Sequence, residues 1–99
     1  MSARVVLSTN AVSDLHAIVD YISIGNERRG HSFVEELNVR IASKLSIFPE
    51  SGVEFGKLRY VVFGNYVAIH DYDSDQNLVT IAMVTEGHRN WRKQFEEPS

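Results

Sequence analysis

Cysteine is absent from this chain of 99 residues. The protein therefore has no disulfide framework, no thiolate nucleophile and no zinc or iron–sulfur site with cysteine ligands. Its composition fits a reducing compartment such as the cytoplasm. Long hydrophobic runs are missing as well, because no apolar stretch approaches the ~20 residues that a membrane-spanning helix needs. The N-terminal segment MSARVVLSTN also lacks the basic start and apolar run of a secretory signal. We therefore expect a cytoplasmic protein without a role in membranes.

Positive charge is in short supply. The chain has 10 Lys and Arg residues against 13 Asp and Glu residues, and its formal net charge is -3. Proteins whose main task is to hold a nucleic-acid backbone are usually basic, so we do not expect direct binding of nucleic acid. The length and the ordinary apolar fraction predict one domain with one core, over residues 1–99.

Motifs of several enzyme classes are also missing. The sequence has no glycine-rich phosphate loop, no G-x-S-x-G nucleophile motif and no paired carboxylates for acid–base hydrolysis. Asp71 resembles the first residue of an EF-hand calcium loop, but Gln76 and Ala82 stand where that loop needs glycine and a bidentate glutamate. The histidines form no short pair at metal-ligand spacing: His16, His31, His70 and His88. We therefore expect no metal and no cofactor.

What the sequence does contain is a clear order of secondary-structure signals. The aliphatic run at residues 4–7 predicts a first strand, and the polar residues 8–10 are candidate N-caps for a helix that follows. That helix has an apolar stripe at helical spacing: Val12, Leu15, Ile18, Val19 and Ile22. After a break at Gly25-Asn26, a second stripe recurs every four residues: Phe33, Leu37, Ile41 and Leu45. Two helices joined by so few residues form an antiparallel hairpin.

A three-stranded antiparallel segment is predicted for the last third of the chain. Gly64-Asn65 suits a two-residue hairpin turn, because Gly accepts a positive φ and Asn tolerates it. This turn fixes the register and predicts four pairs: Phe63 with Tyr66, Val61 with Ala68, Arg59 with His70 and Lys57 with Tyr72. Across the second loop, a pairing of Tyr72 with Leu78 places Thr80 beside His70.

The register divides the sheet into two faces. One face is apolar, and we expect the helical hairpin to cover it: Leu58, Tyr60, Val62, Val67, Ile69, Val79, Ile81 and Met83. The other face is polar and is expected to stay open: Lys57, Arg59, His70, Tyr72 and Thr80. The predicted fold is therefore α+β, with a helical hairpin on one face of a small, mainly antiparallel sheet in the order β-α-α-β-β-β. A short C-terminal helix follows, in which Trp91 and Phe95 pack back onto the sheet edge.

The polar face leaves two interpretations open. An arginine fork suits phosphate or carboxylate, and a histidine exchanges a proton near neutral pH. Arg59 and His70, together with Lys57 and Arg89, therefore form a candidate site for RNA cleavage by attack of the 2'-hydroxyl. The same residues are equally compatible with a cross-strand polar pair on a solvated surface.

In order and spacing, these segments resemble the RelE/ParE superfamily of toxins from bacterial type II toxin–antitoxin modules. The motifs that carry the resemblance run through nearly the whole chain: Leu15-x-x-Ile18-x-x-Tyr21-Ile22, Phe33-x-x-x-Leu37, Leu45-x-x-x-Pro49-x-x-Gly52, Leu58-Arg59 and Gly87-His88-Arg89-Asn90. The resemblance implies a RelE-like fold and a toxin function.

The superfamily has two branches with different targets. RelE-like members are ribosome-dependent mRNA endonucleases, and resemblance to them implies a nuclease site at Arg59, His70, Arg89 and Lys57. They typically carry a tyrosine where this chain has Phe95. ParE-like members inhibit DNA gyrase and lack the nuclease residues, and their tails are similar to Gly87–Asn90 and Phe95. We therefore favour a ParE-like, non-enzymatic gyrase inhibitor, with the mRNA endonuclease and a non-toxic interaction domain as alternatives.

The resemblance also implies partners. It implies a cognate antitoxin, DNA gyrase as the target and a role in plasmid stabilisation, and it leaves both a homodimer and a toxin–antitoxin hetero-oligomer open. The helical hairpin and the edge strand at residues 4–7 suit a docking helix and strand addition. The predicted partner-binding surface is Lys57, Arg59, His70, Tyr72, Arg89, Trp91 and Phe95.

Overall fold

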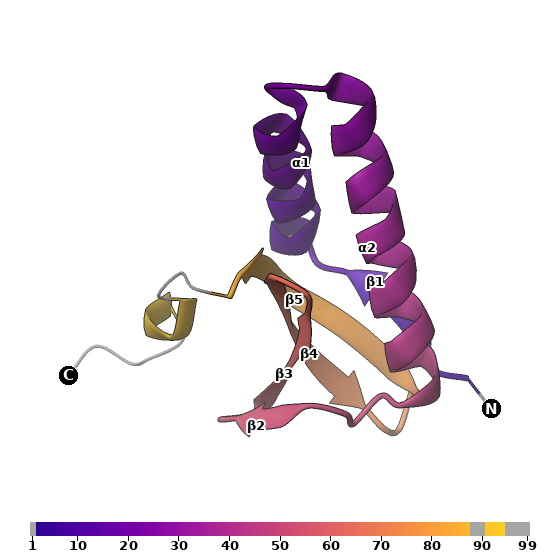
Figure 1. Cartoon of the computed structure of the whole chain (residues 1–99). Coiled ribbons are helices and arrows are strands. Elements are labelled where there is room, and N and C mark those ends of the chain that lie inside the picture. Colours follow the sequence, from indigo (N-terminus) through magenta and orange to yellow (C-terminus); the bar gives the residue numbers. More distant parts are fainter. Residues whose placement is uncertain (1, 88–90, 95–99) are drawn as a thin grey trace.

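The computed structural model describes residues 2–87 and 91–94. Over those residues the elements follow in the order β1 (Arg4–Leu7), α1 (Thr9–Ser23), α2 (Glu27–Ile47), β2 (Val53–Phe55), β3 (Leu58–Phe63), β4 (Tyr66–Asp73), β5 (Leu78–Glu86) and the 3-10 helix η1 (Trp91–Gln94). The α1–α2 hairpin packs on one side of the sheet, and the end of the hairpin that carries its loop extends beyond the strands (Figure 1). The predicted α+β fold is confirmed, with the short strand β2 as an addition that the sequence did not predict.

The strand order explains why the start of the chain lies beside its last strand. Within the described residues the sheet has five strands in the order β1-β5-β4-β3-β2. β1 pairs with β5 in parallel, whereas the other neighbouring strands are antiparallel. β1 and β2 are therefore the two edges of the sheet, and the start of α1 lies next to β5.

Both helices begin at a side-chain cap. The Ser8 side chain accepts a hydrogen bond from the Ala11 backbone N–H at 3.0 Å, and the Asn26 side chain accepts one from the Arg29 N–H at 3.2 Å. Each bond satisfies a donor that has no partner inside its own helix. The caps thus fix where the two helices start, and they agree with the candidate caps at residues 8–10 and the predicted break at Gly25-Asn26.

The two helices pack closely at Gly30. A Cβ atom at this position would lie 2.7 Å from the Val19 carbonyl oxygen of α1 and would also overlap the Ser23 hydroxyl. Glycine is therefore required here by the packing of the hairpin, because any side chain would push the helices apart.

On β3 and β4 the helices cover the opposite face of the sheet from the one predicted, whereas Val79 and Ile81 of β5 lie beneath the helices as expected. The core beneath the hairpin contains buried residues from both helices and from the sheet: Leu15, Leu37, Ile41, Leu45, Val61, Phe63, Tyr66, Ala68, Val79, Ile81 and Val84. A second apolar cluster contains Val67, Ile69, Met83 and Trp91, with Phe55, Leu58 and Tyr60 packed against it. The expectation that one face is apolar and the other open is wrong, because apolar residues line both faces and a different partner covers each.

The register of the first hairpin is as predicted from Arg59 to Phe63, but the predicted pair of Lys57 with Tyr72 is not formed, because Lys57 lies in the turn before β3. The register of the second hairpin differs from the prediction. Arg59 pairs with His70, and Gly64 has a φ of 63° in the turn. Tyr72, however, pairs with Val79 rather than Leu78, and a bulge shifts the register between Ile69 and His70, which pair with Met83 and Ile81. Thr80 accordingly lies opposite Asp71 and not beside His70. Because of the bulge at Ala82, Ile81 and Met83 join different clusters although they are two residues apart.

The first turns of α1 bind the backbone of β5 beyond the end of β1. Ser8 Oγ and Asn10 Nδ2 donate hydrogen bonds to the Ala82 carbonyl at 3.0 and 3.3 Å. Asp14 Oδ2 accepts a hydrogen bond from the Val84 N–H at 3.0 Å. Burial raises the pKa of Asp14, and the bond from Val84 opposes this effect. The hydrogen bonds of these three side chains attach the start of α1 to the bulged part of β5.

Candidate functional site

His70, which the sequence places in a candidate nuclease site, is buried beneath the loop that follows α2. Its exposed fraction is 0%, and it is the one polar side chain among the buried residues of the described ranges. The imidazole Nε2 donates a hydrogen bond to the Pro49 carbonyl at 3.1 Å, whereas Nδ1 is buried and has no hydrogen-bond partner in the described ranges. Burial lowers the pKa of His70, because the charged form would lose its hydration. The expectation of an open polar face is therefore wrong at this residue.

Arg59 lies next to His70 in the register but is engaged elsewhere. Its Nη2 atom lies 3.2 Å from Glu54 Oε1 on the neighbouring strand β2. The Glu54 side chain is 77% exposed, so this cross-strand pair contributes little to stability. Lys57 is exposed in the turn between β2 and β3. The structure therefore separates the predicted trio, with one residue buried, one paired at the surface and one in solvent.

Tyr72 belongs to the margin of the core. Its ring packs against the cluster beneath the helices, and its hydroxyl donates a hydrogen bond to Asn77 Oδ1 at 2.7 Å. Asn77 ends the β4–β5 loop with a φ of 51°, a conformation that Asn tolerates better than most residues. The tyrosine thus secures a turn, which sequence spacing alone did not indicate.

Trp91 closes the face of the sheet that the helices leave uncovered. Only 2% of the residue is exposed, and its ring lies 5.5 Å from the Phe55 ring and 5.0 Å from the Tyr60 ring in edge-on geometry. Aromatic pairs at such distances favour this arrangement. The predicted packing of Trp91 onto the sheet agrees with this position. Arg89 and Phe95, the other two residues predicted in this region, lie outside the described residues.

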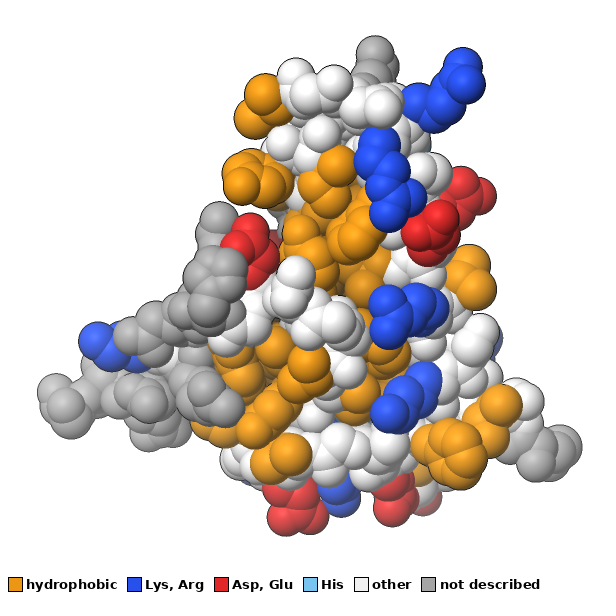
Figure 2. All heavy atoms as spheres, in the orientation of Figure 1, with side chains coloured by type: hydrophobic (Ala, Val, Ile, Leu, Met, Phe, Trp, Pro, Cys, Tyr) orange, Lys and Arg blue, Asp and Glu red, His pale blue; other side chains and the backbone are white. Residues whose placement is uncertain are grey.

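A feature that the sequence analysis missed lies between the helices and the β3–β4 turn. The Phe33 and Tyr66 rings lie 5.5 Å apart. Ile18, Tyr21 and Tyr66 line one small cavity together with the carboxylate residues Asp14 and Glu86. Phe63 pairs with Tyr66 across the hairpin turn. We call these residues the aromatic hollow: Ile18, Tyr21, Phe33, Phe63 and Tyr66. Figure 2 shows hydrophobic side chains gathered between α1 and α2 and continuing over the sheet.

Basic side chains of α2 border the aromatic hollow. The Arg29 guanidinium lies 5.4 Å from the centre of the Phe33 ring, and the Arg40 guanidinium lies 5.9 Å from the centre of the Phe63 ring. Lys44 is exposed one helical turn beyond Arg40. Figure 2 shows Lys and Arg side chains along this side of α2. In the sequence these basic residues recur along one face of the helix, outside its apolar stripe.

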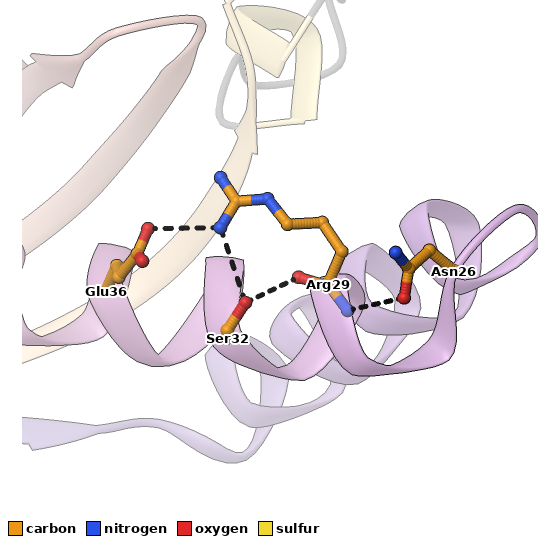
Figure 3. A network of polar contacts seen from close by, with 4 residues as sticks. All are labelled: Asn26, Arg29, Ser32 and Glu36. Atoms are coloured by element: carbon orange, nitrogen blue, oxygen red, sulfur yellow. Dashed lines mark hydrogen bonds and ion pairs between the residues drawn. The ribbon is translucent and has the colours of Figure 1, made fainter.

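Arg29 is held by a local network, drawn in Figure 3. Its Nη1 atom donates to Ser32 Oγ at 3.3 Å and lies 3.4 Å from Glu36 Oε2. Both charged side chains are more than half exposed, at 51% and 63%. Because solvent screens such a pair, it contributes little to the stability of the fold.

The other side of the hairpin forms an open groove of about 740 Å³. Two histidines and two carboxylates line it together with apolar residues: His16, Asp20, His31 and Glu35. Across the described ranges, however, no three His, Cys, Asp or Glu residues are grouped so that they could hold a metal ion. In the same ranges, no helix combines the length and the apolar character needed to cross a membrane.

The family is decided by comparison with known proteins. A family model for the ParE toxin of type II toxin–antitoxin systems, parDE, matches residues 5–91. The chain belongs to the ParE toxin family. No curated protein matches this ParE-family chain in sequence.

Solved structures of related toxins share the fold of this ParE-family toxin. The chromosomal ParDE system of P. aeruginosa matches with a TM-score of 0.71 at 15% identity, over 86% of this chain and 96% of that one. The RelBE2 toxin–antitoxin complex of Mycobacterium tuberculosis matches with a TM-score of 0.67 at 17% identity, over 90% and 95% of the two chains. A mutant of the E. coli toxin RelE in the free state matches with a TM-score of 0.67 at 11% identity, over 95% and 93%.

Proposed function

We propose that this ParE-family toxin acts by binding DNA gyrase and inhibiting it, without a catalytic step of its own. The observation that carries the proposal is the structure of the uncovered sheet face. In the described residues that face is filled by Val67, Ile69 and Met83 and closed by Trp91. An RNA-cleaving site needs an acid, a base and cations around one phosphate, whereas an apolar surface of this kind provides none of them.

The position of His70 supports the same proposal. The nuclease hypothesis needs the imidazole to exchange a proton with substrate, but its exposed fraction is 0% and its Nε2 proton is committed to the Pro49 carbonyl. A proton carrier must lie within hydrogen-bond reach of the group on which it acts. The formal net charge of -3 also disfavours a protein that works on a ribosome.

We further propose that a cognate antitoxin neutralises the toxin in the cytoplasm and that the pair forms a plasmid-stabilising module. The similar solved structures include the intact E. coli RelBE toxin–antitoxin complex and an archaeal RelE–RelB complex from Pyrococcus horikoshii. In this chain, β1 is a short edge strand with Val6 36% exposed, and a partner strand can extend the sheet there.

Two measurements on the chain expressed alone test the target. Inhibition of supercoiling by purified gyrase, with DNA damage in the cell, is the expected result. Rapid loss of mRNA and arrest of translation, abolished by Arg59→Ala, would instead establish the endonuclease. Normal growth, intact mRNA and unaffected gyrase would contradict both functions and leave a non-toxic interaction domain.

A further inference from the structure

The open groove between α1 and α2 carries two pairs of side chains that are common metal ligands. On α1 Asp20 follows His16 by four residues, and on α2 Glu35 follows His31 by four residues. All four residues line the groove. Side chains four residues apart lie on one face of a helix, with about 5–6 Å between their Cβ atoms, and an imidazole and a carboxylate at this spacing suit one divalent ion. We call these pairs the α1 half-site (His16 and Asp20) and the α2 half-site (His31 and Glu35).

Neither half-site is occupied by contacts of the fold itself. All four residues are exposed, and none of them forms an ion pair with another residue of the ranges 2–87 and 91–94. A metal ligand must be free of its proton, as an ionised carboxylate and a neutral imidazole are near pH 7.5. An ion can therefore bind to either half-site without first breaking a contact.

One chain does not complete a metal site from these residues. Gly30 of α2 packs against Val19 and Ser23 of α1, so the two half-sites lie across the groove from each other. In the described part of the chain, no three His, Cys, Asp or Glu residues are grouped so that they could hold a metal ion. Zn²⁺ in a structural site takes four ligands in tetrahedral geometry. The two ligands that a half-site lacks must therefore come from another molecule.

We propose that Zn²⁺ joins two copies of this toxin through their open grooves. The α1 half-site of one copy and the α2 half-site of the other hold one ion, and the reverse combination holds a second ion. Each ion then has two imidazole nitrogens and two carboxylate oxygens, which suit Zn²⁺ better than Mg²⁺ or Ca²⁺. A two-fold dimer provides this reciprocal arrangement, because every contact between two different patches occurs twice.

The apolar residues of the groove fit the same arrangement. Ile24 lines the groove and is 85% exposed, and a second copy over the groove would cover it. The site goes beyond the proposed function, because none of its residues belongs to the predicted partner-binding surface. Its test therefore does not depend on gyrase or on an antitoxin.

Sedimentation velocity of the untagged, full-length toxin tests the proposal with the metal alone as the probe. The toxin should be a monomer in EDTA and in MgCl₂, and it should become a dimer in ZnCl₂ with one ion bound per chain. CoCl₂ should also give the dimer, together with the strong visible absorption of tetrahedral Co²⁺. A dimer that persists in EDTA, or Zn²⁺ binding by a toxin that stays monomeric, would overturn the proposal.

A matched pair of variants tests the ligands. Glu35→Gln removes a charged ligand and should raise the Zn²⁺ concentration at half-dimerisation by about tenfold or more. Glu36→Gln is the control, because it makes the same change at the next residue, which is exposed but does not line the groove. It should leave the Zn²⁺ dependence within about twofold of the wild type. Equal behaviour of the two variants would contradict the assignment of Glu35.

A mixing experiment tests whether each ion is shared between copies. His16→Ala and His31→Ala should each dimerise poorly with Zn²⁺, because every ion loses one ligand. In a mixed dimer of the two variants, the intact α2 half-site of the first meets the intact α1 half-site of the second and restores one complete ion site. An equimolar mixture should therefore recover dimer that neither variant forms alone. If the mixture does not recover it, the ions are not shared in this way and the proposal is wrong.

Discussion

Replacing the buried histidine should remove a pH dependence from the stability of the fold. The test variant is His70→Leu, which keeps an apolar side chain of similar size in a site with an exposed fraction of 0%. Near pH 7.5 the variant loses one hydrogen bond to the Pro49 carbonyl but also removes the buried Nδ1 atom that has no partner. Each of these effects is worth about 1 kcal/mol with opposite sign, so the free energy of unfolding should change little.

The two proteins should diverge as the pH falls. Burial lowers the pKa of His70 below its ordinary value of 6.5, and a weaker contribution from Arg59 acts in the same direction. The hydrogen bond to Pro49 and the charge of Asp71 oppose this shift without reversing it. The unfolded chain therefore takes up a proton below about pH 6.5 that the folded chain does not.

The sign and size of the effect follow from this difference in proton uptake. The contribution of neutral His70 to stability is complete above the unfolded pKa and is lost as the pH falls through 6.5 toward the folded pKa. The loss reaches at most about 1.4 kcal/mol per pH unit. The His70→Leu variant lacks this loss. Asp14, whose pKa is raised by burial, titrates equally in both proteins and cancels in the comparison.

Urea unfolding at a series of pH values between about 7.5 and about 5 measures the effect. His31→Leu is the control, because it makes the same substitution at an exposed residue of α2. Parallel loss of stability in the wild type and in His70→Leu across this range would refute the reasoning, because it would mean that His70 is protonated equally in the folded and unfolded chains.

Three further substitutions test the packing, and urea unfolding measures each of them. Trp91→Ala should cost about 3 kcal/mol or more, because it empties the centre of the second apolar cluster, and an unchanged midpoint would mean that the ring does not cover the sheet. Gly30→Ala should lower the free energy of unfolding by about 1–3 kcal/mol, because the new methyl group overlaps the Val19 carbonyl. The same change in an exposed helix raises the free energy of unfolding, so the sign of the change shows whether the helices are in contact at Gly30. Asp14→Ala should cost about 1–3 kcal/mol by leaving the Val84 N–H without its acceptor, and Asp14→Asn, which keeps an acceptor oxygen, should recover part of this loss.

Local signals were sufficient for the two helices and for the first hairpin. The apolar periodicity of α1 and α2 and the Gly64-Asn65 turn predicted the helices and the pairing of Arg59 with His70, because these features depend on residues close in sequence. The choice of face could not be predicted in this way. Alternation shows that two sets of residues face opposite sides, but both sets here are largely apolar, and only the positions of the hairpin and Trp91 decide which partner covers which set.

The candidate site was predicted less well than the helices and the first hairpin. The β4–β5 loop closes with Asp73 opposite Leu78, one residue away from the expected pairing of Tyr72 with Leu78, and this difference places Thr80 opposite Asp71. The Pro49 carbonyl that covers His70 lies 21 residues away in sequence, so the burial of the imidazole could not be inferred from strand alternation. The aromatic hollow was missed for a similar reason, because Phe33 and Tyr66 meet only when the hairpin packs against the β3–β4 turn.

The hydrogen bonds from Ser8, Asn10 and Asp14 to β5 have a consequence for association. An unpaired strand edge invites strands of other molecules and is a common start for aggregation. Beyond the end of β1, the side chains of α1 occupy the Ala82 carbonyl and the Val84 N–H and take the place of a neighbouring strand. The helix thus blocks intermolecular pairing along this stretch, and a strand from another molecule must add at the outer edge of β1 or β2. Loss of the Asp14 carboxylate would reopen one of these positions, so self-association should increase together with the loss of stability.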